Sequence, residues 1–316
     1  MKPPEIIVIG ELNVDIILNR IDRFPEMGKE ILAGDLDLTL GSSSAIFAGN
    51  LSSLGSRVAF IGKIGNDGFS STVLGSLQKL GVDTSHIIRS SKYNTGATIV
   101  LNFGNDRAMV TYPGAMEDLN AGDIDHDFLE TARHLHFSSV FLQPGIRPSL
   151  PGLFKQAKAA GLTTSLDPQW DPEEKWEINA TELFLHLDIF MPNMAEFLNL
   201  TASETLEKGI EKIKQYAPQL ILVIKDGING AYAWNGSTLI HQPALLNENP
   251  VDCIGAGDSF NAGFIRKFTR GASLVECLEY GALTGAVSTT CAGGTGAFAD
   301  IKAAAETALK QFNKTL

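Results

Sequence analysis

The sequence predicts an α/β fold for residues 1–316, a single-domain three-layer α/β/α sandwich with a mostly parallel central sheet and a small β lid. Three observations support this prediction. Short apolar runs recur along the chain and stop at glycine or polar residues, as expected of strands covered on both faces. Helical patterns separate several of these runs, which favours parallel pairing. Two further segments alternate with period two, which is typical of strands with one exposed face.

The predicted strands of the central sheet are apolar and rich in β-branched residues. The first, 5-EIIVIG-10, ends at the glycine that follows its apolar run. A helical pattern over 149–161 lies between two of the later strands, as a right-handed crossover requires. Those later strands are 58–65, 134–141, 162–168, 187–193 and 220–227.

The two segments with period-two alternation are 29–41 and 96–114. The second includes Gly104-Asn105-Asp106, which is typical of a hairpin turn. We expect a small β lid with strands from about 12–40 and 95–115. The lid is also a candidate surface for homodimer formation, and plain edge strands are the alternative.

Composition and charge restrict the class of partner. The chain has 44% hydrophobic and 19% charged residues, and its net charge of −11 removes the attraction that nucleic acid or an anionic membrane would need. No apolar run approaches the ~18 residues of a membrane span, and no signal-peptide pattern precedes the first strand. Cys253, Cys277 and Cys291 are odd in number and far apart, so we expect free thiols and a cytoplasmic protein.

The stretch 251-VDCIGAGDSFNAGF-264 is the strongest candidate for a reactive site. A strand-like PVDCI leads into a GAG turn, and Phe260, Phe264 and Phe268 then recur on one helical face. Glycine-rich backbone at a helix N-terminus is suited to binding a phosphate. Asp258 beside such a site is either a base in phosphoryl transfer or only the helix N-cap, and spacing alone leaves both open.

Two other phosphate-binding motifs are missing. No GxxxxGK[ST] occurs, and no GxGxxG follows the first strand. A nicotinamide-dependent oxidoreductase therefore loses most of its support.

The segment 252-DCIGAGD-258 resembles the C-terminal signature of the ribokinase-like (PfkB) carbohydrate kinases, with Cys253 at the usual threonine, and the resemblance covers nearly the whole chain. It implies a ribokinase-like fold and ATP-dependent phosphorylation of a hydroxyl of a small sugar or sugar derivative. It also implies that Asp258 is the general base. The implied anion hole consists of Gly255, Ala256, Gly257 and the Asp258 amide.

Near the N-terminus, 10-GELNVD-15 resembles the sugar-binding start of this family, which makes Asn13 and Asp15 substrate ligands. Both can share one face of a strand, and surface polarity is the alternative. Gly41 and Ser42 begin the segment that matches the family's GGxxAN signature, and they are implied substrate-binding residues. Ser42 replaces the second glycine, and Ile46 replaces a sugar-contacting asparagine.

The implied nucleotide end includes 192-PNMAEF-197, which matches the N-x-x-E motif. Asn193 would contact the nucleotide phosphates and Glu196 would help to place Mg²⁺, often through water, and an ordinary N-cap with a first-turn acid is the alternative. Lys225, Gly227 and Gly230 resemble the nucleotide-binding strand and turn, although a plain hairpin explains them equally well. The glycine-rich turn in 281–298 resembles the region near the adenine and a monovalent-cation site for an ion such as K⁺.

Substrate identity is less constrained than reaction type. The segment 166-LDPQWDPEEKW-176 resembles the DxNxR stretch of fructokinase-like and 2-keto-3-deoxygluconate kinase-like members, but Gln169 and Asp171 replace its asparagine and arginine. Since that arginine can face an acidic sugar, its absence weakens the case for a sugar-acid substrate. Arg107 in the lid could still meet a carboxylate, or it could be a solvated charge. His134 and His136 share a strand face without a third ligand, so packing is favoured over a metal site.

Two alternatives to a sugar kinase remain open. An adenosine-like nucleoside kinase fits the same family. A sugar-binding regulatory protein that has lost turnover is compatible with the altered 41-GSSSAI-46, but it has no need for a base beside an anion hole. In each reading the partner is a small molecule.

Overall fold

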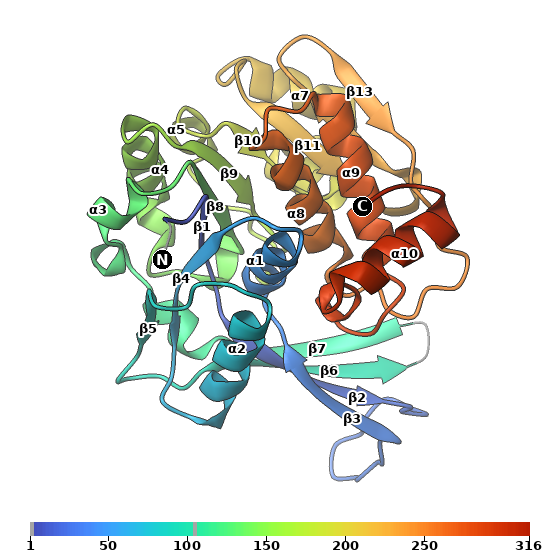
Figure 1. The fold of residues 1–316 in the computed structure, drawn as a ribbon. Coiled ribbons are helices and arrows are strands. Elements are labelled where there is room, and N and C mark those ends of the chain that lie inside the picture. The colour runs from blue at the N-terminus through green and yellow to red at the C-terminus, as the bar shows by residue number, and fades with distance from the viewer. Residues whose placement is uncertain (1–2, 104–105) are drawn as a thin grey trace.

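The computed structural model describes residues 3–103 and 106–316, and its main feature is a large, mostly parallel sheet (Figure 1). Within the described residues the strand order is β13-β12-β11-β10-β9-β8-β1-β4-β5. All pairs from β5 to β11 are parallel, and the last two pairs are antiparallel. The strands are β1 (Ile6–Ile9), β4 (Val58–Ile64), β5 (Ile87–Arg89), β8 (His134–Ser138), β9 (Thr163–Asp167), β10 (Ile189–Phe190), β11 (Ile221–Lys225), β12 (Ala231–Trp234) and β13 (Leu239–Gln242).

Helices cover both faces of this sheet, which confirms the three-layer prediction. Successive residues of β1 point into two separate apolar clusters, Ile6 and Val8 into one and Ile7 and Ile9 into the other. The first cluster is covered by α1 (Ser43–Ser53), α2 (Gly68–Lys79), α8 (Ala256–Phe268), α9 (Leu274–Ser288) and α10 (Ile301–Phe312). The second is covered by α3 (His126–Leu129), α4 (Leu150–Ala159), α5 (Ala180–Phe184), α6 (Met194–Leu200) and α7 (Leu206–Lys214).

Two predicted strands differ from the structure. The strand expected over 187–193 is only two residues long in β10, because Pro192 has no N–H to continue the ladder. The strand-like PVDCI before the GAG turn is irregular. Its backbone is held by α9 rather than by a strand, since the Val251 N–H donates to the Thr289 carbonyl at 2.8 Å.

The lid is a separate four-stranded sheet that projects from the main sheet (Figure 1). Residues 29–34 of the period-two segment are irregular, and the predicted Gly104-Asn105 turn lies outside the described residues. In the order β3-β2-β6-β7, only the β2–β6 pair is parallel. The strands are β2 (Asn13–Asn19), β3 (Asp35–Leu40), β6 (Gly96–Phe103) and β7 (Asp106–Tyr112).

The two faces of the lid have different chemistry because of its register. One cross-strand row aligns Asp15 with Thr98 and Thr98 with Thr111. The neighbouring row belongs to the opposite face and aligns Ile16 with Ile99 and Ile99 with Val110. The lid therefore has a polar face and an apolar face.

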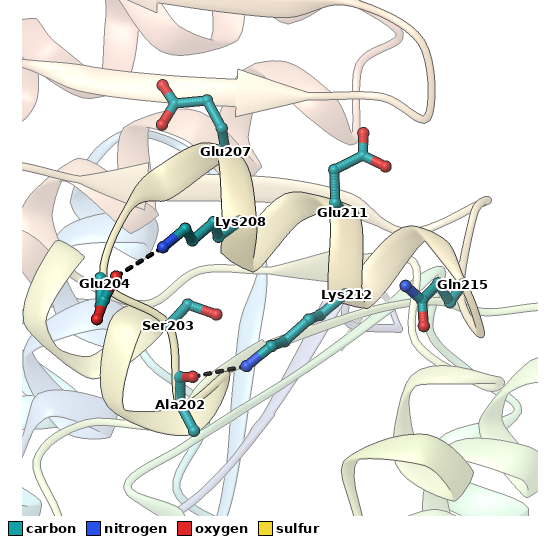
Figure 2. Close-up of a pocket in the computed structure, with 8 residues that line it drawn as sticks. All are labelled: Ala202, Ser203, Glu204, Glu207, Lys208, Glu211, Lys212 and Gln215. Carbon is teal, nitrogen blue, oxygen red and sulfur yellow. Dashed lines mark hydrogen bonds and ion pairs between the residues drawn. The ribbon is translucent and has the colours of Figure 1, made fainter.

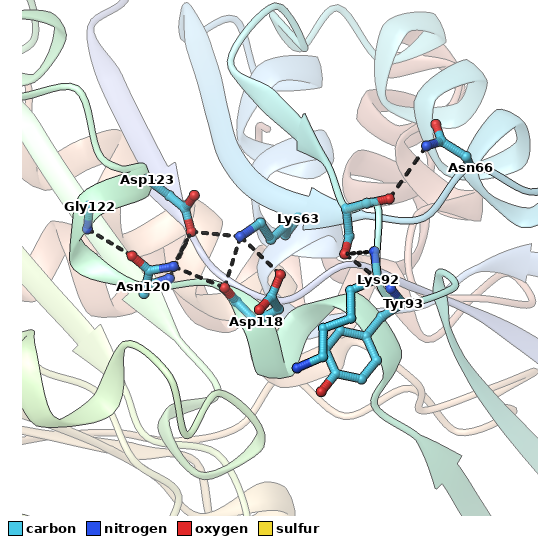
Figure 3. Close-up of polar contacts among 9 residues, drawn as sticks. Lys63, Asn66, Lys92, Tyr93, Asp118, Asn120, Gly122 and Asp123 are labelled. Carbon is cyan, nitrogen blue, oxygen red and sulfur yellow. Dashed lines mark hydrogen bonds and ion pairs between the residues drawn. The ribbon is translucent and has the colours of Figure 1, made fainter.

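The ends of the β6–β7 hairpin are tied to the main sheet. Lys63 on β4 is almost completely buried, and its Nζ donates to the Asp118 carbonyl at 2.9 Å and to Asp123 Oδ2 at 2.8 Å (Figure 3). These acceptors follow β7 in the chain. Before β6, the Thr95 N–H donates to Asp67 Oδ2 at 2.7 Å. These bonds fix the base of the lid.

Candidate active site

The polar centre of the molecule lies where β9 and β11 end. Asp167 and Lys225 are the last residues of these strands, and Lys225 Nζ is 2.5 Å from Asp167 Oδ2. Asn261 Nδ2 on α8 donates to the same oxygen. The Asp167 side chain is fully buried, so the lysine and the asparagine replace its hydration. The carboxyl edge of a parallel sheet is the usual place for a binding site in such folds.

The GAG turn forms the entrance to α8. Gly255 is the N-cap, with φ of 72°, and a Cβ there would lie 2.7 Å from Gly294 Cα, so this position requires glycine. The Ala256 N–H donates to the Cys253 carbonyl at 3.3 Å. Among the described residues, the amides of Gly255, Gly257 and Asp258 have no such acceptor. A Cβ on Gly257 would lie 3.9 Å from Lys225 Nζ. Unpaired amides and an ammonium group therefore meet at an anion-binding turn.

Asp258 lies in the first turn of α8, but it is not the N-cap, so the cap alternative is wrong. Its Oδ1 accepts a hydrogen bond from Gln169 Nε2 at 3.1 Å. Burial raises the pKa of Asp258 well above its usual range, and the nearby Asp167 charge raises it further, while Lys225 opposes the shift. Asp258 is therefore a carboxylate of increased basicity beside an anion-binding turn.

Asn13 and Asp15 lie together on β2, as predicted. Asn13 Nδ2 donates to Asp15 Oδ1 and to Thr98 Oγ1, each at 3.0 Å. A Cβ on Gly41 would lie 2.2 Å from Asp15 Oδ1, so the glycine makes room for this pair. Burial raises the pKa of Asp15 to about 6, and Arg107 partly counteracts the shift. The polar face of the lid thus holds a buried amide–carboxylate pair.

Ser42 and Ile46 account for the altered glycine-rich signature. Ser42 has φ of 71°, a conformation in which glycine is usual, and its Oγ caps α1 by accepting from the Ala45 N–H at 3.0 Å. The same Oγ donates to the Glu11 carbonyl at 2.6 Å. Ile46 is buried against the anion-binding turn, since a Cβ on Gly255 would lie 3.0 Å from its Cγ2. At this position an apolar packing contact therefore takes the place of the sugar contact that the family's asparagine makes.

Asn193 and Glu196 form a reciprocal capping box at the start of α6. The Glu196 N–H donates to Asn193 Oδ1 at 2.9 Å, and the Asn193 N–H donates to Glu196 Oε2 at 2.8 Å. Burial and the Asp167 charge raise the pKa of Glu196 to about 7. No cluster of three or more metal-ligating side chains occurs in 3–103 or 106–316. The ordinary N-cap with a first-turn acid is therefore present, and both Glu196 oxygens accept from Asn193, so a Mg²⁺ ion would be held here through water rather than directly.

Gly227 and Gly230 lie in the hairpin between β11 and β12. Gly230 has φ of 98°, and a Cβ there would lie 2.0 Å from the Gln242 carbonyl oxygen. The plain hairpin of the alternative interpretation is therefore present. Lys225, which precedes it, points instead to the Asp167 carboxylate and the GAG turn.

The histidines are packed side chains, as favoured from the sequence. His134 Nε2 and His136 Nδ1 each lie 2.7 Å from Ser165 Oγ. The His136 ring stacks on Phe47 with a centroid separation of 3.8 Å. Burial lowers the pKa of His134 to about 3. All three cysteines are free, as predicted.

The family model of the pfkB family carbohydrate kinases matches residues 3–301. The chain belongs to this family. The carbohydrate kinase is 30% identical over 271 residues to the 2-dehydro-3-deoxygluconokinase of Bacillus subtilis (strain 168), covering 80% of this chain and 81% of that one. It is 27% identical over 304 residues to the 5-dehydro-2-deoxygluconokinase of Geobacillus thermodenitrificans (strain NG80-2), covering 90% and 87%.

Solved structures support the same fold. A ribokinase from Thermotoga maritima superposes with a TM-score of 0.81 at 26% identity, covering 97% of this chain and 99% of that one. A ribokinase from Arabidopsis thaliana, complexed with ribose and ATP, has a TM-score of 0.82 at 24% identity, covering 98% and 99%. The predicted family, fold and reaction class are therefore confirmed.

Sequence reasoning missed two polar residues of this kinase. Asp167 lies in 166–176, where the departures at Gln169 and Asp171 are the more conspicuous signal, and Asn261 lies beyond the GAGD signature in 251–264. An aspartate at the carboxyl end of a predicted parallel strand is a usable signal. Asn261 also follows Asp258 by three residues, which places both on one helical face.

A surface hollow at the start of α7 lies apart from these residues (Figure 2). Its two lysines have local acceptors, since Lys208 Nζ is 2.6 Å from Glu204 Oε2 and Lys212 Nζ donates to the Ala202 carbonyl at 2.6 Å. The hollow contains none of the predicted site residues. Among the residues that the structure describes, no helix is long and apolar enough to cross a membrane.

Proposed function

We propose that Asp258 is the general base with which this carbohydrate kinase transfers the γ-phosphoryl group of ATP to a sugar hydroxyl. The observation that supports the base is the position of its buried carboxylate, in the first turn of α8 beside unpaired amides and next to Lys225. A carboxylate there would repel a phosphate unless its role were to accept a proton.

In the proposed reaction, the sugar hydroxyl gives its proton to Asp258 as its oxygen bonds to the γ-phosphorus. The bond from that phosphorus to the bridging oxygen breaks, and ADP leaves. The amides of the GAG turn and the Lys225 ammonium stabilise the charge on the transferring group. Mg²⁺, when bound, neutralises phosphate charge, and Asn193 and Glu196 are suited to hold it through water.

We assign the sugar to the polar face of the lid. Asn13 and Asp15 supply an amide and a carboxylate that can bind sugar hydroxyl groups. Gly41 has no side chain, which leaves room for both of them next to its backbone. The Ser42 hydroxyl is already bonded to the Glu11 carbonyl and the Ala45 N–H, so Ser42 shapes the sugar site by capping α1 rather than by contacting the sugar. The lid limits water access to the anion-binding turn, which reduces ATP hydrolysis.

An acidic sugar is the substrate class with most support from the relatives, two of which are named dehydro-deoxygluconokinases. Arg107 acts electrostatically on Asp15, so its positive charge is near the sugar end of the site. Arg107→Gln should therefore raise KM for a sugar acid about 10- to 100-fold and leave KM for a neutral sugar unchanged. Equal effects on both would favour a neutral substrate.

The decisive experiment is a panel of neutral sugars, sugar acids and nucleosides, read by ADP release with Mg²⁺ and ATP. Asp258→Asn should lower kcat by about 10²- to 10⁴-fold with little change in KM for ATP. Full turnover in that variant would reject Asp258 as the base. Turnover of nucleosides alone would favour a nucleoside kinase, and sugar binding without ADP release would favour a regulatory protein. A higher rate in K⁺ than in Na⁺ buffer would support the monovalent-cation site.

The apolar face of the lid supports a homodimer. Leu38, Ile99 and Val110 form part of one cross-strand row and are each more than 40% exposed. Identical apolar faces can pair about a two-fold axis, which removes this surface from water. Val110→Lys should convert the dimer to monomer in sedimentation experiments, whereas Leu309→Lys on α10 should not. A wild-type monomer at all concentrations would reject the dimer.

A further inference from the structure

The loop after β9 contacts the proposed base. Gln169 is two residues beyond the end of β9, and its Nε2 donates to Asp258 Oδ1 at 3.1 Å. The two residues are 89 positions apart in the chain. Gln169 also replaces the asparagine of the DxNxR stretch, so the side-chain amide is retained with one additional methylene.

The backbone around Gln169 is held in an unusual conformation. Gln169, Glu174 and Trp176 have φ of 58°, 53° and 56°, the left-handed region that residues other than glycine rarely adopt. Conformations of this kind persist when surrounding contacts enforce them, and they concentrate at functional sites.

Two buried carboxylates enforce this conformation. Asp171 accepts backbone N–H bonds from Glu173 at 3.0 Å, Lys175 at 2.9 Å and Trp176 at 2.7 Å. Asp167 Oδ1 accepts the Gln169 N–H at 3.2 Å. Asp171, which stands at the arginine position of the DxNxR stretch, is therefore a structural residue of the loop.

The base needs such a contact because its surroundings favour protonation. Burial and the negative charges of Asp167 and Glu11 raise the pKa of Asp258, and the nearby Lys225 ammonium lowers it only in part. A donor aimed at the ionised carboxylate opposes this effect and also restricts its rotation. The Ser43 hydroxyl is a second donor that acts in the same direction.

We infer that Gln169 is a positioning residue that keeps the Asp258 carboxylate ionised and fixed in orientation, and that the strained loop 168–176 serves to present its amide. This inference rests on the proposed role of Asp258 as the base. Gln169 itself need not touch the reacting atoms.

Three substitutions test the amide. Gln169→Gly removes it while tolerating the left-handed backbone, Gln169→Glu keeps the size but replaces the donor with a second carboxylate, and Gln169→Asn retains a shorter amide. Infrared titration of the free protein follows the carboxylic-acid carbonyl band that Asp258→Asn abolishes. We expect its midpoint to rise by about one pH unit in the glycine variant and further in the glutamate variant. Unchanged midpoints in both would overturn the inference.

Kinetics with the sugar that the panel identifies give a second readout. The glycine and glutamate variants should lose about 10- to 100-fold in kcat, and the acid limb of the kcat profile should move to higher pH. Gln169→Asn should recover most of the rate. Lower kcat with an unmoved acid limb would mean that Gln169 only supports the loop, which overturns the inference. Full turnover in Asp258→Asn is a different failure, because it rejects the base itself.

Discussion

The two sheets of this kinase differ in how their faces are covered. The main sheet is covered by helices on both sides, and its carboxyl edge holds the buried Asp167–Lys225 pair. The lid sheet has one polar face, with Asn13 and Asp15, and one apolar face that is partly exposed. Under the proposed function the two sheets divide the work: the buried sheet organises charges for phosphoryl transfer, and the lid selects the sugar.

Removing the lysine of the main sheet should have the largest effect. Lys225→Met leaves the Asp167 carboxylate buried without its cation, so we expect a loss of about 3–5 kcal/mol in the free energy of unfolding, together with loss of turnover. Urea denaturation at neutral pH measures the change in the free energy of unfolding. Lys208→Met, which breaks an exposed pair with Glu204, is the control and should change stability by less than about 1 kcal/mol. Similar small effects in both variants would contradict the role of the buried pair.

The matching change in the lid should affect sugar binding rather than stability. Asp15→Asn removes a charged hydrogen-bond acceptor, so we expect KM for the sugar to rise about 10- to 100-fold with a smaller change in kcat. Asp37→Asn on the exposed part of β3 is the control. A fall in kcat at constant KM would place Asp15 with the reacting groups and would break the comparison.

The pH dependence should separate the same two regions. Asp15, with its pKa raised to about 6, is a charged hydrogen-bond acceptor only when ionised, so kcat/KM for the sugar should fall about tenfold per unit as the pH drops below about 6. Asp15→Asn should remove this part of the profile. If the fall in kcat/KM below about pH 6 persists in that variant, another titrating group causes it, and Asp258 is the first such group to test.

The histidines of the main sheet should make its stability sensitive to acid. In the unfolded chain the pKa of His134 is near 6.5, whereas burial lowers it to about 3 in the folded protein. The unfolded state therefore binds a proton that the folded state does not, and stability is lost as the pH falls from about 6.5 to about 3. The loss should be about 1.4 kcal/mol at pH 5.5. Urea denaturation should show a weaker pH dependence in His134→Gln, and an unchanged slope would argue against this cause.

Much of the site was predictable because its signals are local. The GAG turn marks a helix start, since close backbone approach at Gly255 excludes a Cβ. The alternation of polar residues in β2 places Asn13 and Asp15 together. The predicted strand at PVDCI was wrong because the Val251 and Asp252 N–H groups donate to the carbonyl of Thr289 at the C-cap of α9, a contact that no local pattern reveals.

The sequence by itself determined the fold class, the family and the identity of the proposed base, because periodicity and a short contiguous motif carry that information. Only the tertiary structure brought Lys225 to Asp167, 58 positions apart, and Gln169 to Asp258, 89 positions apart. The order of strands in the sheet decides these contacts. Burial by the assembled layers then sets the ionisation of each carboxylate, and this is a property of the whole fold rather than of any segment.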